Sequence, residues 1–222
     1  MSAQFHIATG LSKIGMFLRS EGWRQADAAS LTPTQAQILV QLAQRGTARI
    51  TALAEELAIT QPTASDAATA LIRKGHVERR ADPADARASL LHLKPSGRRA
   101  AKAMAAWPDA LLAAADTLAP DEQAVLLKTL TKMIRSLQVQ GAIPVQRMCA
   151  TCRYFRPDIH QDPATPHHCD FVNAAFGDAQ LRLDCGEHEA ASESEATAAW
   201  RRFTGSDASQ TDAPPAATDE AP

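Results

Sequence analysis

Residues 76–94 read HVERRADPADARASLLHLK, and this stretch decides the fold of the first half of the chain. Val77 begins a run that predicts one strand, and Leu91 and Leu93 alternate with polar residues in a run that predicts a second. The segment DPAD between the two runs has the composition of a turn. We therefore predict a two-stranded hairpin with a charged tip.

Two short helices joined by a tight connection are predicted immediately before the hairpin. Residues 49–59, RITALAEELAI, place Leu53, Ala54 and Leu57 on one face. Residues 60–75, TQPTASDAATALIRKG, begin with Thr60 as the N-cap and end at a glycine. Two short helices in this order predict a helix-turn-helix.

Further helices are predicted on both sides of this motif. Residues 5–22 carry apolar side chains at helical spacing, and in residues 31–46 Thr32 caps a helix that starts with Pro33. After the hairpin, residues 95–118 predict one long helix with a kink at Pro108, and residues 120–138 predict another. The expected fold class is therefore mainly α, with one small hairpin.

The hairpin sequence DPADARASLLHLKPSG resembles the wing of the MarR family of bacterial transcriptional regulators. That family has an Asp-x-Arg at the wing tip and a strand that ends in Leu-Thr-x-x-Gly. Asp85, Arg87, Leu93 and Gly97 match this pattern, while Lys94 replaces the threonine. The resemblance extends over the helix-turn-helix and covers roughly residues 5–140.

The resemblance implies a homodimeric winged helix-turn-helix with a two-stranded wing and long dimerisation helices, which binds a palindromic operator in double-stranded DNA. The start of the second helix of the motif is expected to enter the major groove, and Arg87 to enter the minor groove with its guanidinium held by Asp85. The basic residues around the motif are expected to contact phosphates. The candidate DNA-binding residues are Gln61, Thr63, Ser65, Arg73, Lys74, Arg79, Arg80, Asp85 and Arg87.

The charge distribution agrees with a polyanionic partner. Residues 41–103 contain eleven Lys and Arg against six Asp and Glu, a net charge of +5, whereas residues 187–222 have a net charge of -6. A solvated charged surface is the alternative that charge by itself leaves open. The sequence has no long apolar run and no basic start followed by an apolar stretch. We therefore expect no membrane span, no secretion signal and a cytoplasmic location.

All four cysteines lie in the last third of the sequence: Cys149, Cys152, Cys169 and Cys185, spaced as C-x2-C-x16-C-x15-C. Four thiolates complete a tetrahedral set for a soft or borderline metal, and a reducing cytoplasm disfavours a disulfide. The spacing is similar to that of high-potential iron–sulfur proteins, which implies a [4Fe-4S] cluster as the cofactor. Zn²⁺ is the alternative, because His167, His168 and His188 lie nearby and each could replace a cysteine.

These features predict four segments: a DNA-binding and dimerisation domain (1–140), a linker (141–148), a Cys/His-rich module (149–203) and a disordered acidic tail (204–222). We expect a non-enzymatic transcriptional regulator, a repressor whose DNA affinity depends on the cysteine-bound cofactor. The first alternative is a regulator that senses a small aromatic or phenolic effector and has a structural zinc. A metal-dependent redox or hydrolytic enzyme is the second alternative, but four cysteines would leave no open ligand position.

Overall fold

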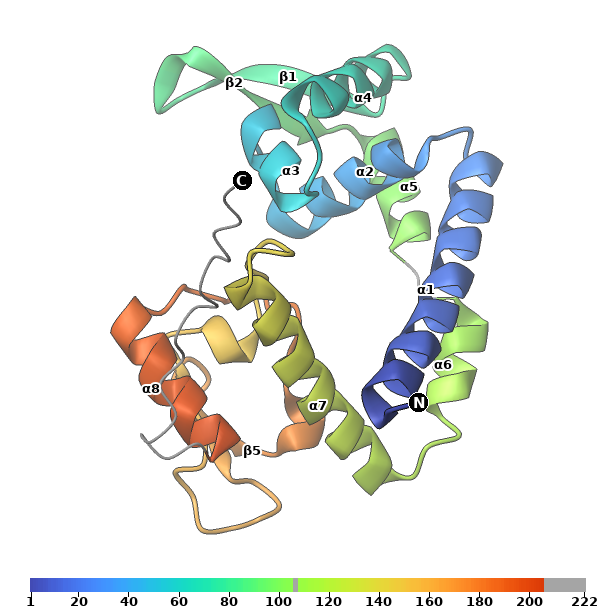
Figure 1. Cartoon of the computed structure of the whole chain (residues 1–222). Helices are drawn as coiled ribbons and strands as arrows, with labels where there is room; N and C mark the ends of the chain where they lie inside the picture. Colours follow the sequence, from blue (N-terminus) through green and yellow to red (C-terminus); the bar gives the residue numbers. More distant parts are fainter. Residues whose placement is uncertain (106–107, 206–222) are drawn as a thin grey trace, which may run out of the picture. The chain divides into compact units, whose positions relative to one another are not determined.

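The chain divides after Leu118 into two packing units, residues 1–118 and 119–222. The computed structural model in Figure 1 describes residues 1–105 and 108–205. Each unit has its own hydrophobic core. The division is one of packing, so the functional boundary expected near residue 140 stays a prediction.

The first unit begins with a long helix, α1 (Ala3–Ala28), which extends beyond the predicted range in both directions. The second helix, α2 (Pro33–Arg45), begins as predicted. The Thr32 side chain accepts the backbone N–H of Gln35, and the Gln35 side chain accepts the backbone N–H of Thr32. This reciprocal cap fixes the point where the chain enters α2.

The helix-turn-helix consists of α3 (Ile50–Glu56) and α4 (Gln61–Arg73). The hairpin that follows is β1 (Val77–Asp82) paired antiparallel with β2 (Asp85–Leu93). Val77 pairs with Leu93 and Arg79 with Leu91, and the register shifts at Ala81 and Asp82 near the tip. The predicted winged helix-turn-helix is therefore confirmed.

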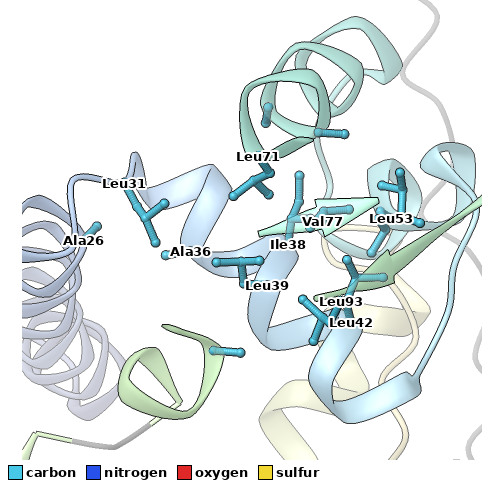
Figure 2. Packing of buried hydrophobic residues seen from close by; sticks show 14 residues of the cluster. Ala26, Leu31, Ala36, Ile38, Leu39, Leu42, Leu53, Leu71, Val77 and Leu93 are labelled. Atoms are coloured by element: carbon cyan, nitrogen blue, oxygen red, sulfur yellow. The ribbon is translucent and has the colours of Figure 1, made fainter. Parts of the chain in front are cut away.

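The core of the first unit joins α2, α4 and the wing. Figure 2 shows Ile38 and Leu39 of α2 facing Leu71 of α4 and Val77 of β1, and all four side chains are buried. Each such side chain contributes about 1.5–3 kcal/mol when it leaves water. This packing fixes the base of the wing against the helix-turn-helix.

The long helix predicted after the wing is two helices, α5 (Pro95–Met104) and α6 (Asp109–Ala115). Pro108 is the N-cap residue of α6, with φ -57° and ψ 128°, so the chain leaves helical geometry there. The alanine-rich sequence pattern continues on both sides of Pro108, so the pattern alone predicts one helix where the backbone forms two. Residues 106–107 lie outside the described part of the chain.

The second unit begins with α7 (Pro120–Val139) and continues through the cysteine segment. The short elements of this segment include a three-stranded sheet in the order β3-β4-β5. Helix α8 (Glu193–Thr204) begins at a capping box of Ser192 and Glu195, and its Phe203 is buried against Phe155. The elements after α7 are η1 (Cys149–Thr151), β3 (Phe155–Arg156), β4 (His167–Cys169), β5 (Ala174–Phe176), η2 (Asp178–Gln180) and α8 (Glu193–Thr204).

No helix within residues 1–105 and 108–205 is long and apolar enough to cross a membrane. Most of the acidic tail predicted from residue 204 lies beyond the described residues, because only Thr204 and Gly205 of that segment belong to them.

Candidate functional site

The first turn of α4 presents the predicted base-reading residues. The Thr60 side chain caps the helix by accepting the backbone N–H of Thr63 over 3.3 Å. Gln61 and Thr63 are exposed, and Ser65 is half-buried. The N-terminus of a helix carries a partial positive charge, so this exposed polar turn can approach the edge of a DNA groove.

The wing extends from the same unit as α4, and β1 contacts α4 (Figure 1). Arg87 is exposed near the tip of the hairpin. The carboxylate of Asp85 accepts the backbone N–H of Arg87 over 3.1 Å, and its second oxygen lies 3.6 Å from Nη1 of Arg49. Asp85 thus shapes the turn through the Arg87 backbone, whereas the sequence predicts a bond to the Arg87 guanidinium. An Asp side chain is short, and in turns it commonly accepts the backbone N–H two residues further along the chain.

Arg49 contacts the wing from outside it, and the sequence does not reveal this contact. It precedes α3 as the N-cap residue, and its Nε donates to Oδ2 of Asp82 over 2.7 Å. The Asp82 side chain is only 8% exposed and also accepts the backbone N–H of Ala84 over 2.9 Å. The Ala84 N–H and then Arg49 lower the pKa of Asp82, and they outweigh its burial. Arg49 therefore links the helix-turn-helix to the wing tip.

The candidate phosphate contacts differ in their surroundings. Arg73 and Arg79 are exposed, at the end of α4 and on β1. Arg80 is exposed and pairs with Glu78. Lys74 donates to the Ser30 carbonyl and to Oε1 of Gln35, so it links α4 to the start of α2. A role for these four residues at phosphates stays a prediction.

The four cysteines line one cavity of about 360 Å³ in the second unit. Its remaining walls are mostly apolar, with the rings of Tyr154, Phe155 and Phe176 among them. All four cysteines are free thiols and half-buried. The folding of the segment thus gathers sulfur atoms from η1, β4 and the loop before α8.

Hydrogen-bond donors surround two of the sulfurs. The backbone N–H of Arg182 donates to Sγ of Cys149 over 3.3 Å, and Nη1 of Arg182 lies 3.8 Å from Sγ of Cys185. Burial raises the pKa of the Cys149 thiol to about 11. A metal group that binds here must displace that proton, because the thiolate is the ligand.

The arrangement of the cysteines around the cavity can be compared with the needs of zinc and of an iron–sulfur cluster. A single zinc ion holds its sulfurs at about 2.3 Å, which places them about 3.8 Å from one another. Within residues 1–105 and 108–205, no three His, Cys, Asp or Glu side chains converge on one ion position. Cysteine thiolates hold iron–sulfur clusters in dry surroundings, and the four thiols and aromatic walls of the cavity are of that kind. The choice between a cluster and zinc stays a prediction.

The histidines that keep zinc open as an alternative lie outside this cavity lining. His167 is fully buried and lies behind the wall, against Phe155 and Phe176 at ring centroid distances of 5.4 Å. Nε2 of His188 lies 3.0 Å from Oγ1 of Thr151, and Nδ1 of His168 lies 3.2 Å from Nε2 of His160.

Residues 31–89 match the family model of the MarR family. This match covers the helix-turn-helix and most of the wing, and it ends before the cysteine segment. MarR is therefore the family that this part of the chain resembles in sequence. The comparison with curated proteins found no match.

Solved structures similar to the chain include two protein–DNA complexes. The S. aureus MepR–DNA complex is 25% identical, with a TM-score of 0.50, and the similarity covers 60% of this chain and 98% of that one. Streptococcus pneumoniae FabT in complex with DNA is 22% identical, with a TM-score of 0.55, and the similarity covers 63% of this chain and 99% of that one. The FabT likeness supports the fold of the MarR-like part.

Proposed function

We propose that the protein is a sequence-specific DNA-binding transcriptional regulator, a repressor, whose DNA affinity depends on a cofactor bound by its four cysteines. The observation that supports DNA binding is the joint exposure of the first turn of α4 and the wing residue Arg87 in one winged unit. The MarR match over residues 31–89 and the DNA complex of MepR support the same reading.

In this proposal the two parts of the winged unit read different grooves. Gln61, Thr63 and Ser65 approach base edges in the major groove, and Arg87 enters the minor groove, where a narrow A·T segment concentrates negative potential. Arg49 holds the wing near its tip through Asp82, so the position of Arg87 relative to α4 is fixed before DNA binds.

Binding as a homodimer is supported by apolar residues that the chain leaves exposed. Leu126, Met133 and Leu137 of α7 are 44, 39 and 41% exposed and lie on one face at spacings of seven and four residues. Phe5 and Ile14 of α1 are also exposed. A second copy of the chain would bury these side chains, and a two-fold dimer would bind a palindromic operator.

The cavity of about 360 Å³ supports a [4Fe-4S] cluster held by Cys149, Cys152, Cys169 and Cys185. Bound there, the cluster would supply a redox-sensitive and oxygen-sensitive group, and the protein's part is to hold it and exclude water. The Arg182 N–H groups would stabilise the negative charge on the sulfurs of Cys149 and Cys185. No position is left open for a substrate, so we propose no enzymatic reaction.

Two measurements test this function. Protein purified without oxygen is assayed for iron, sulfide and zinc and for visible absorbance; about four iron and four sulfide ions per chain are expected. A colourless protein with one zinc per chain would replace the cluster by the structural-zinc alternative. Selection of DNA fragments by the loaded protein, followed by titration at fixed salt, should give a palindromic site bound by two chains. A monomer that selects no sequence would overturn the regulator.

The dependence of DNA binding on the cofactor needs its own comparison. The loaded and cofactor-free chains are titrated against the selected site at the same salt concentration, because phosphate contacts make affinity salt-dependent. We expect the loaded form to bind at least about fivefold more tightly, which corresponds to a coupling of ~1 kcal/mol. Equal affinities would reduce the cofactor to a structural role.

A further inference from the structure

Helix α7 carries the cysteine segment on one face and exposed apolar residues on the opposite face. Lys128, Thr131 and Gln138 face the segment, and Thr131 and Gln138 are buried. At 100° per residue, Leu126 and Met133 lie on the other side of the helix. If the cysteine segment moves α7, the exposed apolar residues on the opposite face of the helix therefore move with it.

One attachment runs from the cavity wall to α7 through a buried histidine. The rings of Phe155 and Phe176, which line the cavity, both pack on His167. Nε2 of His167 lies 2.9 Å from Oδ1 of Asp178, and Oδ2 of Asp178 accepts from Nζ of Lys128 over 3.0 Å.

The tautomer of this histidine follows from its second bond. The backbone N–H of Asp158 donates to Nδ1 of His167 over 3.1 Å, so Nε2 carries the proton and donates to Asp178. His167 is fully buried, and Lys128 lies over the ring of Phe203 at 5.3 Å. Each hydrogen bond from the Asp158 N–H through His167 and Asp178 to Lys128 thus has a definite donor and acceptor. The buried ring of His167 has little freedom to rotate.

A second attachment lies ten residues further along α7. Nε2 of Gln138 donates to Sδ of Met148 over 3.4 Å, and Met148, fully buried, precedes the first cysteine. The two attachments are about 15 Å apart along the helix. The attachment at Gln138 belongs to the segment of Cys149, and the attachment at Lys128 leads to His167 in the strand of Cys169. A group bound by both cysteines would therefore fix two points of α7.

We propose that Asp178 is the positioning residue that couples the cysteine cavity to α7, so that filling the cavity strengthens the association of two chains through the exposed face of α7. This inference rests on the proposed function, because it takes the cluster and the dimer from it. Asp178 is not one of the residues that line the cavity. It acts by holding His167, the residue behind the cavity wall, in a fixed position against Lys128.

The test measures dimer association of the full chain, with and without cofactor. Chains are reconstituted with ferrous iron and sulfide without oxygen, and the dimer dissociation constant is obtained by sedimentation. Hydrogen exchange of the α7 amides is recorded in parallel. We expect loading to tighten the wild-type dimer about tenfold and to protect α7.

The variant Asp178→Asn should take up the same iron and sulfide and show the same visible spectrum. Its loading should tighten the dimer by less than about threefold. Lys128→Gln interrupts the same contact from the α7 side and should lower the coupling in the same way, which covers the case that Asp178→Asn fails to fold. Asp121→Asn, which removes one carboxylate from the first turn of α7, is the matched control and should couple like wild type.

The possible outcomes distinguish the role of Asp178 from the proposed cofactor-dependent function on which it rests. Full coupling in Asp178→Asn and Lys128→Gln overturns the role of Asp178 and leaves the cluster and the dimer intact. A wild-type chain that takes up no iron, or that loads without any change in dimerisation, overturns both the cofactor-dependent function and this inference. Reduced coupling in both variants with an unchanged spectrum supports it.

Discussion

Arg49 and Asp82 are 33 residues apart in the sequence, and their side chains form a hydrogen bond of 2.7 Å between Nε and Oδ2. This bond joins the start of α3 to the end of β1, and therefore the helix-turn-helix to the wing. Asp82 is almost fully buried, so its charge depends on this partner and on the Ala84 N–H. This bond connects the wing directly to the helix-turn-helix.

Removal of the guanidinium should loosen the wing. In Arg49→Met the Asp82 carboxylate loses its charged partner, and we expect the free energy of unfolding to fall. Urea unfolding of the full chain measures this. Arg45→Met is the matched control, because Arg45 forms an ion pair with Glu56, whereas Arg49 contacts both Asp82 and Asp85, and the loss in Arg45→Met should be smaller. Equal losses in the two variants would contradict the role given to Arg49.

Stability should depend on pH through Asp82. The Ala84 N–H and Arg49 lower the pKa of Asp82 below its ordinary value of 3.8. Its contribution to stability is therefore present above about pH 4 and is lost as the pH falls through the folded-state pKa. The difference in unfolding free energy between wild type and Asp82→Asn should be largest above about pH 5 and shrink below about pH 4. A difference that stays constant from pH 7 to pH 3 would refute this.

Arg87 should contribute to DNA affinity without contributing to stability. It is exposed, so Arg87→Ala should leave the unfolding midpoint unchanged while it weakens binding to the selected site by ~1–3 kcal/mol. Fluorescence anisotropy at constant salt measures the affinity. Arg201→Ala removes an exposed arginine from α8 and should have little effect. The prediction fails if the two variants bind DNA equally well.

Gly97 should tolerate no side chain. A Cβ at this position would lie 2.1 Å from the carbonyl oxygen of His76, a backbone atom that cannot turn aside. We expect Gly97→Ala to lower the free energy of unfolding by about 1–3 kcal/mol through overpacking. Gly15→Ala in α1 meets no atom within 4 Å and should be neutral or slightly stabilising. Thermal unfolding of the two variants decides, and a stable Gly97→Ala would show that the wing and α5 can separate.

Local patterns of the sequence predicted most of the elements, because caps and periodicity act within a few residues. Thr32 and Thr60 each cap the helix that the sequence assigns to them. The kink predicted at Pro108 is a break between two helices, α5 and α6, although the alanine-rich pattern continues on both sides of it. Local helix propensity and backbone geometry compete there, and the geometry prevails.

The sequence by itself determined the winged helix, the four-cysteine set and the identity of the groups that can meet DNA or a metal, because residue type fixes chemistry and spacing fixes local structure. Only the tertiary structure decided that Arg49 holds Asp82, that the four thiols surround one cavity, and that His167 and Asp178 stand between that cavity and α7. These contacts join residues far apart in the chain, and their distances depend on how whole elements pack. A linear pattern carries no such distances.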